Sequence, residues 1–216
     1  MNWDLAVFRA KCQANNLPTE RLDELIDTLV KIKKRTNHHG QLSIDRWDEQ
    51  FQGNEFDFLS DEADQLEFEA ETNFIAALQA IHPIADIMGQ IINLTVLNSH
   101  FAVHDASLYK VKTKLTNLNN PQHAAIISAV DTLYTSNEFM FIDAFVNTIK
   151  HRNLIESYHY AEYGTDTENR NGLRTEQFEY KQNTYSPIWV DTVINNYFST
   201  VFDNAINIGN AINSYL

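Results

Sequence analysis

Residues 84–97, IADIMGQIINLTVL, place apolar side chains on almost every face of a helix with 3.6 residues per turn. A helix that is apolar on nearly all sides needs other elements around it, because only they remove those side chains from water. Pro83 stands directly before this segment and ends or kinks whatever helix precedes it. The segment therefore predicts a central helix that other helices surround.

Apolar residues recur at helical spacing on both sides of this central segment. The stripes predict helices within residues 4–16, 19–35, 60–82, 121–134, 137–149 and 187–208. Residues 98–120 have the weakest pattern, with a candidate helix at 106–118. Residues 40–60 contain Gly40 and Gly53 and are expected to form an irregular connection, with His38 and His39 in a solvated turn before it.

The apolar period changes after Glu156 to a loose alternation of aromatic and polar residues. Tyr158, Tyr160 and Tyr163 form one such series, and a second series follows the polar residues 164–172. This pattern predicts a small β-hairpin insertion near residues 157–185. The expected fold is thus mainly α, an up-and-down helical bundle of six to seven helices in a single domain over residues 1–216.

The chain is acidic, with a formal net charge of -13, but the acidic residues are concentrated in one segment. Eleven acidic residues and a single base, Arg46, fall between Asp45 and Glu71, so the rest of the chain is nearly neutral. A broadly acidic surface repels nucleic acid, and this concentration weakens that argument for the other segments. The acidic run itself is expected to be a solvated face and loop.

The only cysteine, Cys12, cannot form an internal disulfide and is expected in the core. No positively charged apolar leader precedes Trp3, so the expected location is the cytoplasm. Polar residues interrupt every long apolar stretch before the roughly 20 residues that a membrane span needs. No contact with a membrane is therefore expected.

One short motif, NTIKHRNLIESYH at residues 147–159, suggests chemistry. Arg152 is followed by a polar Asn153 and, after a short spacer, by His159. This arrangement resembles the motif of HEPN-domain proteins, all-helical bundles many of which are metal-independent endoribonucleases in toxin–antitoxin and phage-defence systems. The resemblance implies that Arg152 stabilises phosphate charge, His159 acts as general acid or base, and Asn153 orients the site.

The chemistry is consistent with those residue types. An RNA 2′-hydroxyl can attack its own phosphodiester when a base removes the hydroxyl proton and a cation stabilises the phosphorane. One arginine and one histidine supply both functions, and no metal ion is needed.

A structural role for the same helix is the alternative. Asn147 and His151 are four residues apart and share one helix face, and Lys150 lies beside them. These three side chains are the candidates for a buried polar contact between helices. Buried polar groups require such partners.

The partners would come from the central helix and its approach. His82, Asp86, Gly89 and Asn93 fall within an arc of about 60° at ~100° per residue. Asp86 would pair with Lys150 or His151, and Asn93 would pair with Asn147. A buried carboxylate beside His and Lys is also typical of functional sites with shifted pKa values, so this stripe is a candidate binding site.

Metal and cofactor signatures are weak. His82 with Asp86, and His100 with His104, have the i,i+4 spacing that places two ligands on one helix face. The sequence has one Glu-x-x-His motif, Glu156 with His159, where a di-iron bundle needs two, and it has no HExxH, no phosphate-binding loop, no GxGxxG and no GxSxG. The sequence therefore predicts neither a metal site nor a cofactor.

Two functions remain open from sequence alone. The first is a HEPN-like metal-independent endoribonuclease that acts on RNA. The second is a non-catalytic helical bundle that acts as an interaction or regulatory module, with an internal polar network. The candidate partners are RNA, a second copy of the chain, or another protein.

Overall fold

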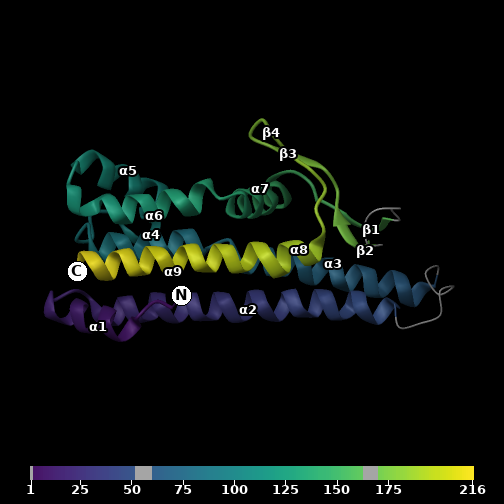
Figure 1. Ribbon diagram of the computed structural model, residues 1–216, viewed down its shortest axis with the longest axis horizontal. Coiled ribbons are helices and arrows are strands. Elements are labelled where there is room, and N and C mark those ends of the chain that lie inside the picture. The colour runs from purple at the N-terminus through teal and green to yellow at the C-terminus, as the bar shows by residue number, and fades with distance from the viewer. Residues whose placement is uncertain (1, 52–59, 163–169) are drawn as a thin grey trace. The chain divides into compact units, whose positions relative to one another are not determined.

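A computed structural model describes residues 2–51, 60–162 and 170–216 (Figure 1). The longer helices are α1 (Leu5–Ala14), α2 (Thr19–Phe51), α3 (Asp61–Ile81), α4 (Ile84–Thr95), α5 (Leu108–Leu118), α6 (Ala124–Thr135), α7 (Asn137–His151) and α9 (Phe198–Tyr215). Shorter turns are η2 (Val103–Asp105), η3 (Pro121–His123), α8 (Val190–Thr192) and the π-helical turn η4 (Val193–Tyr197). The strands are β1 (Ser157–Glu162), β2 (Arg170–Thr175), β3 (Phe178–Tyr180) and β4 (Asn183–Tyr185). The fold is therefore mainly α, a helical bundle with a small β insertion, which confirms the predicted fold class.

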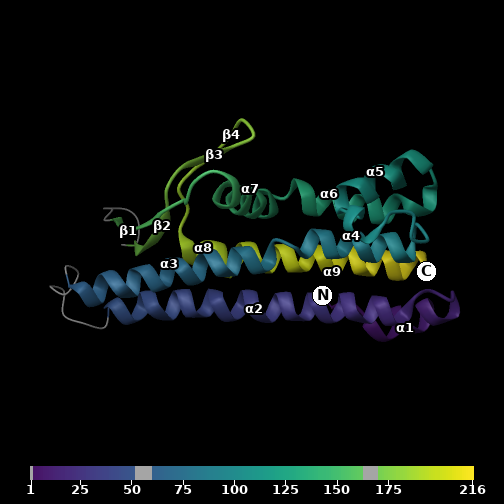
Figure 2. The same cartoon turned by 180° about the vertical axis from the view of Figure 1, so that it is seen from behind.

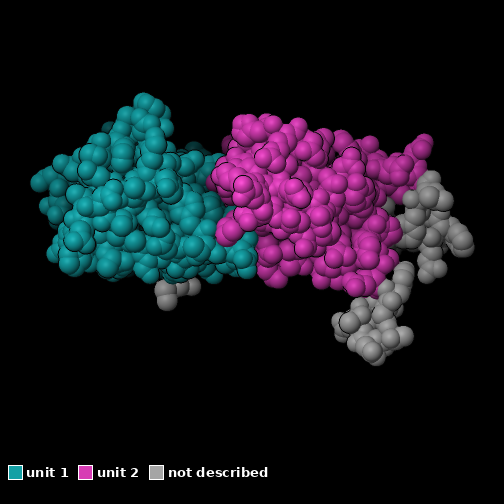
Figure 3. Space-filling model, turned by 90° about the horizontal axis from the view of Figure 1, so that it is seen from above, with its two compact units in different colours: residues 1–33, 83–139, 200–216 teal, residues 34–82, 140–199 magenta. Residues whose placement is uncertain are grey.

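Contacts within the chain divide it into two compact units, which Figure 3 colours separately. Unit 1 comprises Met1–Lys33, Pro83–Phe139 and Thr200–Leu216, and unit 2 comprises Lys34–His82 and Met140–Ser199. Each unit combines segments that are far apart in sequence and has buried apolar residues of its own. The single domain over residues 1–216 stays a prediction.

In unit 1, α4 is the most deeply buried helix, as its apolar sequence predicts. Met88, Ile91 and Ile92 are fully buried. Gly89 lies where α4 meets the start of α5, and a Cβ added there would be only 2.6 Å from the backbone nitrogen of Leu108. The small residue is thus required by the close approach of two helices.

The two ends of the chain meet within unit 1. The Trp3 indole Nε1 donates a hydrogen bond to Asn213 Oδ1 at 3.3 Å, and Lys11 Nζ donates to the Asn213 carbonyl at 2.7 Å. Gly209 on α9 lies against the Trp3 ring, so closely that a Cβ would overlap it. The N-terminal segment is therefore packed on α9.

In unit 2, α2 continues past Gly40 to Phe51, so the predicted irregular connection from residue 40 and the turn at His38 and His39 are wrong. A Cβ added at Gly40 would lie 3.0 Å from Ile194 Cγ2, so this glycine permits close helix packing and does not mark a turn. Residues 52–59 of that connection lie outside the described residues.

The second half of α2 runs beside α3, as both cartoon views show (Figure 2). His39 Nδ1 is 3.1 Å from Asn73 Oδ1, and the buried Ser43 hydroxyl donates to the Ala70 carbonyl at 2.8 Å. Ser60 accepts a hydrogen bond from the Ala63 amide and caps α3, as its sequence predicts. Polar contacts thus fix the register of this helix pair.

Aromatic rings form the core beside α7. Phe145 contacts Phe74 on α3 with ring centroids 5.6 Å apart, and it contacts Phe178 on β3 at the same distance. Phe178 stacks on Tyr185 of β4 at 4.9 Å. These rings join the β insertion to the helices of unit 2, since each edge-to-face or stacked pair contributes stabilisation beyond that of its buried area.

The insertion consists of two antiparallel ladders, here called the β ribbon (β1–β4). Ser157 pairs with Thr175 and Glu162 with Arg170 in the first ladder, and Phe178 pairs with Tyr185 in the second. Lys181 and Gln182 connect β3 to β4 with φ values of 48° and 68°. Two consecutive left-handed residues are typical of the tight hairpin turn that matches strand twist. Tyr163, part of the predicted pattern, lies outside the described residues.

One stretch of the described chain, Asp61–Thr95, is long and apolar enough to cross a membrane by length and composition alone. Half of its most apolar window is buried inside the structure. Core helices of soluble proteins pass the same test, so the stretch is weak support for a membrane span.

Candidate functional site

Arg152 and Asn153 follow directly after α7, where the backbone leaves the helix. The Arg152 guanidinium donates a hydrogen bond to the Glu179 carbonyl at 3.2 Å and lies 5.8 Å from the centre of the Tyr180 ring. The Asn153 amide donates to the neighbouring Leu154 carbonyl at 3.0 Å. Arg152 therefore anchors the end of α7 to strand β3, and Asn153 serves the local turn.

His159 lies on strand β1 and has contacts to three other elements. Its Nε2 is 2.7 Å from Asn171 Oδ1 on β2, and its ring centroid is 5.3 Å from that of Trp47 on α2. Its backbone N–H donates to Glu67 Oε1 on α3 at 3.3 Å. With the amide oxygen of Asn171 as acceptor, Nε2 carries the hydrogen.

The two catalytic candidates are anchored at different points along the β ribbon. His159 pairs with Leu173, whereas Arg152 binds Glu179, six residues further along the chain. Acid–base cleavage of RNA needs both groups within roughly 3 Å of one phosphodiester. The HEPN resemblance implies a helical position for His159, which here lies on a strand. These contacts favour structural roles, and the ribonuclease assignment stays a prediction.

A polar network does form around α7, with a centre that the sequence did not indicate. Asp143 Oδ1 is 3.3 Å from His82 Nε2 and accepts a hydrogen bond from the Asn147 amide at 2.8 Å. The same amide donates to the Asp143 carbonyl at 2.8 Å. Asp143 and Asn147 have i,i+4 spacing on α7, which is the sequence signal that predicts such a pair.

Three other members of the predicted network are exposed. Asp86 is exposed in the first turn of α4, and Lys150 and His151 are exposed in the last turn of α7. The expected burial of Asp86 with a cationic partner is therefore wrong. A carboxylate at a helix N-terminus and cations at a C-terminus are stabilised in place by the helix dipole and by water.

Asn93 is buried, but its partner is a loop and not Asn147. Its side-chain amide donates to the Phe101 carbonyl at 3.0 Å, and its Oδ1 accepts from the Phe101 N–H at 3.0 Å. The intervening Asn98 and Ser99 have φ values of 50° and 59°. Asn93 thus holds a tight turn after α4, because it replaces the backbone partners that the turn lacks.

Carboxylates from α3 bind the free edge of strand β1. Glu71 Oε1 accepts the Ser157 N–H at 2.7 Å, one helical turn beyond Glu67 on the same face. Burial raises the pKa of the half-buried Glu71, the Ser157 N–H lowers it, and nearby carboxylates led by Glu156 raise it further. These contacts cover strand backbone groups that are otherwise unpaired.

Metal ligands do not converge in the part of the chain that the structure describes. No group of three or more His, Cys, Asp or Glu side chains there has the geometry to hold a metal ion. His104 Nε2 is 3.3 Å from its neighbour Asp105, and His100 lies beside the Phe101 ring at 4.8 Å between centroids. His82 contacts Asp143 instead of joining Asp86.

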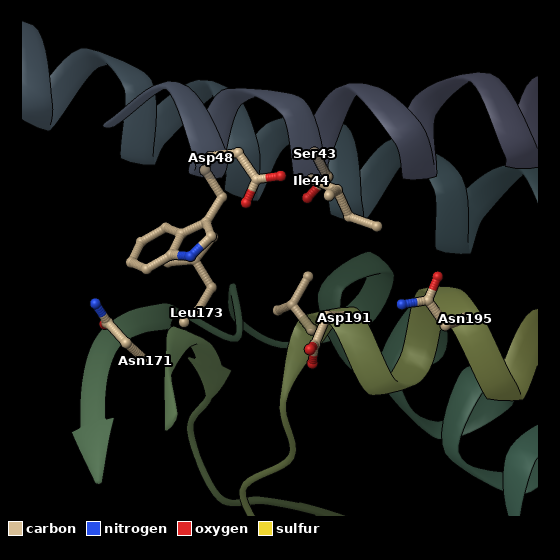
Figure 4. A pocket seen from close by; sticks show the side chains of 10 residues that line it. Ser43, Ile44, Asp48, Asn171, Leu173, Asp191 and Asn195 are labelled. Carbon is tan, nitrogen blue, oxygen red and sulfur yellow. The ribbon is translucent and has the colours of Figure 1, made fainter. Parts of the chain in front are cut away.

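A cavity of about 220 Å³ opens in unit 2 between α2, strand β2 and the turns α8 and η4. Figure 4 shows Ser43, Ile44 and Asp48 on the α2 wall, with Asp191 and Asn195 on the opposite wall. The apolar part of the lining comes from side chains of α2, β2 and α8, and the polar part from carboxylates and amides. The lining residues are Ser43, Ile44, Trp47, Asp48, Asn171, Gly172, Leu173, Val190, Asp191 and Asn195.

Arginine and aromatic side chains alternate on the face of the ribbon beside this cavity. The Arg170 guanidinium lies 4.5 Å from the centre of the Trp189 ring and forms an ion pair with Asp191 at 2.6 Å. Arg174 lies 4.9 Å from the Tyr160 ring centre. Such pairs hold long side chains against the strands, so these cations are already engaged within the chain.

Comparisons with known proteins give no relative from which a role is transferred. No family model matches the chain, and no curated protein or solved structure matches it either.

Proposed function

We propose that this chain is a non-catalytic interaction or regulatory module whose resemblance to HEPN proteins is confined to the motif at residues 147–159. The observation that carries the proposal is the separate anchoring of Arg152 and His159. Arg152 supports β3 through the Glu179 carbonyl, and His159 supports the β1–β2 ladder through Asn171. Arg152 and His159 thus each have a contact that supports the ribbon, and Asn153 serves a local turn.

The polar network supports the same proposal. A catalytic carboxylate–histidine pair is expected to face a cleft, whereas His82 and Asp143 are joined to Asn147 beside the helix backbone. The His82 side chain is 17% exposed and that of Asp143 is 37% exposed. The network therefore supplies hydrogen-bond partners to partly buried polar groups.

The experiment is a paired measurement of stability and RNA cleavage on Arg152→Ala and His159→Ala. We expect both variants to unfold at lower urea concentration, because each loses a cross-element contact worth roughly 0.5–1.5 kcal/mol. We also expect no cleavage of single-stranded RNA by the unaltered chain in EDTA. His104→Ala is the matched histidine control, since that side chain is 83% exposed, and its stability should not change.

A metal-independent endoribonuclease is the second candidate. Arg152 and His159 are both exposed, and Asn171 fixes the orientation of the His159 ring, as a general acid or base requires. This candidate predicts the opposite pattern in the same experiment. RNA cleavage would occur in EDTA, and either substitution would abolish it under conditions in which the variant is still folded.

A further inference from the structure

The cavity in unit 2 combines an apolar floor with an acidic rim. Ile44, Leu173 and Val190 supply aliphatic surface, and the Trp47 indole forms part of the lining. Asp48 and Asp191 supply carboxylates on opposite walls (Figure 4). A small number of polar groups around an apolar pocket is the usual composition of a small-molecule site.

The charge of the lining residues determines whether the cavity favours a cationic or an anionic ligand. No lysine, arginine or histidine lines the cavity as the structure describes it. Asp191 uses Oδ1 to bind Arg170, but Asp48 has neither a hydrogen bond nor an ion pair to any described residue. The side-chain amide of Asn195 is likewise unpartnered among them. These groups are available to a donor-bearing cation and would repel an anion.

The backbone around the cavity departs from regular helix geometry. The π-helical turn Val193–Tyr197 carries Asn195, and single π turns inside helices occur frequently at functional sites. Next to Asn195, Ile194 packs against Gly40 of α2, which lets the two helices approach closely. The irregular turn therefore places Asn195 in the lining, next to a close contact between helices.

We propose that this cavity binds a small organic cation, an ammonium or guanidinium group carried on a short apolar body. Asp48 would bind the charged group, Asn195 would accept one of its hydrogens, and Trp47 would offer its ring face to the cation. The volume of about 220 Å³ is below the roughly 300–1,000 Å³ of drug-sized pockets, so the ligand must be small. The inference does not depend on the roles of Arg152 and His159.

Calorimetric titration of the full chain at low salt tests the proposal with two probes. Butylguanidinium, a single guanidinium on a short apolar chain, represents a free cation, and a capped arginine peptide represents the same group on a partner protein. Saturable binding of either probe below about 10 mM supports the site, and the probe that binds more tightly identifies the source of the cation. Pentanoate, an anion of similar size, should not bind. Failure of both cations to bind would overturn the proposal.

A pair of charge-matched variants locates the binding. Asp48→Asn should weaken binding by about tenfold or more, because it removes a charge-assisted hydrogen bond. Asp45→Asn removes the same charge from α2 at an exposed position outside the lining, where the carboxylate accepts from Gln41, and should leave affinity within about twofold. Leu173→Trp should block binding by filling the floor. Equal effects of the two aspartate substitutions would show non-specific attraction and contradict the assignment.

Discussion

Helix α4 in unit 1 and strand β1 in unit 2 are held in place by opposite kinds of interaction. α4 is fixed by apolar burial and by shape, with Met88 fully buried and Gly89 against the backbone of α5. β1 is fixed by hydrogen bonds from its edge to Glu67 and Glu71. Apolar packing has no titrating group and is not screened by salt, whereas carboxylate contacts respond to pH and to screening. Strand β1 is therefore expected to respond to pH more strongly than α4.

The largest expected effect tests the apolar side of this contrast. Met88→Ala should lower the free energy of unfolding by about 2–5 kcal/mol, because it removes a fully buried side chain and leaves a cavity. Asp86→Ala, on the exposed face of the same helix, should change it by no more than about 0.5 kcal/mol. Urea denaturation measures both. Similar losses for the two variants would mean that α4 is not packed as described.

The next largest effect tests the carboxylate contacts that hold strand β1. Glu71→Ala should lower the free energy of unfolding by about 1–3 kcal/mol, because the Ser157 N–H loses its acceptor in a part-buried site. Glu71→Gln keeps an acceptor oxygen and should restore most of that loss. If glutamine is as damaging as alanine, charge and not the hydrogen bond holds the strand.

A smaller effect is expected at the network around Asp143. Asp143→Ala and Asn147→Ala should be non-additive, with a coupling of about 0.5–1 kcal/mol in a double-mutant cycle, because the two side chains share a hydrogen bond. Asp143→Ala should also change the NMR chemical shifts of the His82 ring, which contacts the same carboxylate. Additive losses together with unchanged His82 ring shifts would contradict the network.

The smallest effect concerns pH. The pKa of Glu71 is raised in the folded chain, chiefly by burial, so folding favours its protonated form. That contribution to stability is present below the unfolded-state pKa and is lost as pH rises through the raised value. As pH rises from the unfolded-state pKa of Glu71 to its raised folded-state pKa, the unaltered chain should therefore lose stability relative to Glu71→Gln. Parallel pH profiles of the two proteins would show that the shift has no effect on folding.

Residue patterns within a segment correctly predicted whether that segment forms a helix or strands. The apolar sequence of α4, the Ser60 cap of α3 and the switch to alternating aromatics after Glu156 each indicated the correct element, because each signal lies within the segment that it describes. The predicted end of α2 near Gly40 was wrong, and the reason is physical. A glycine that permits contact with Ile194 has the same letter as a glycine that ends a helix, and only the packing partner distinguishes them.

The candidate sites depend on contacts between distant segments. Asp143 was missed because its partner His82 is 61 residues away in sequence, and the stripe on α4 pointed to Asp86 instead. The cavity joins α2 to residues more than 120 positions later, so no periodicity reveals it. Residue types suggested which side chains do chemistry, but their partners came from tertiary structure alone.

RNA cleavage under metal-free conditions tests the central claim most directly, that Arg152 and His159 serve the architecture of the ribbon. The full chain is incubated in excess over end-labelled single-stranded RNA in EDTA, and the products are resolved with their termini identified. We expect the same pattern as with heat-denatured protein. Products with 2′,3′-cyclic phosphate ends that are absent with His159→Ala would contradict the claim and establish the endoribonuclease.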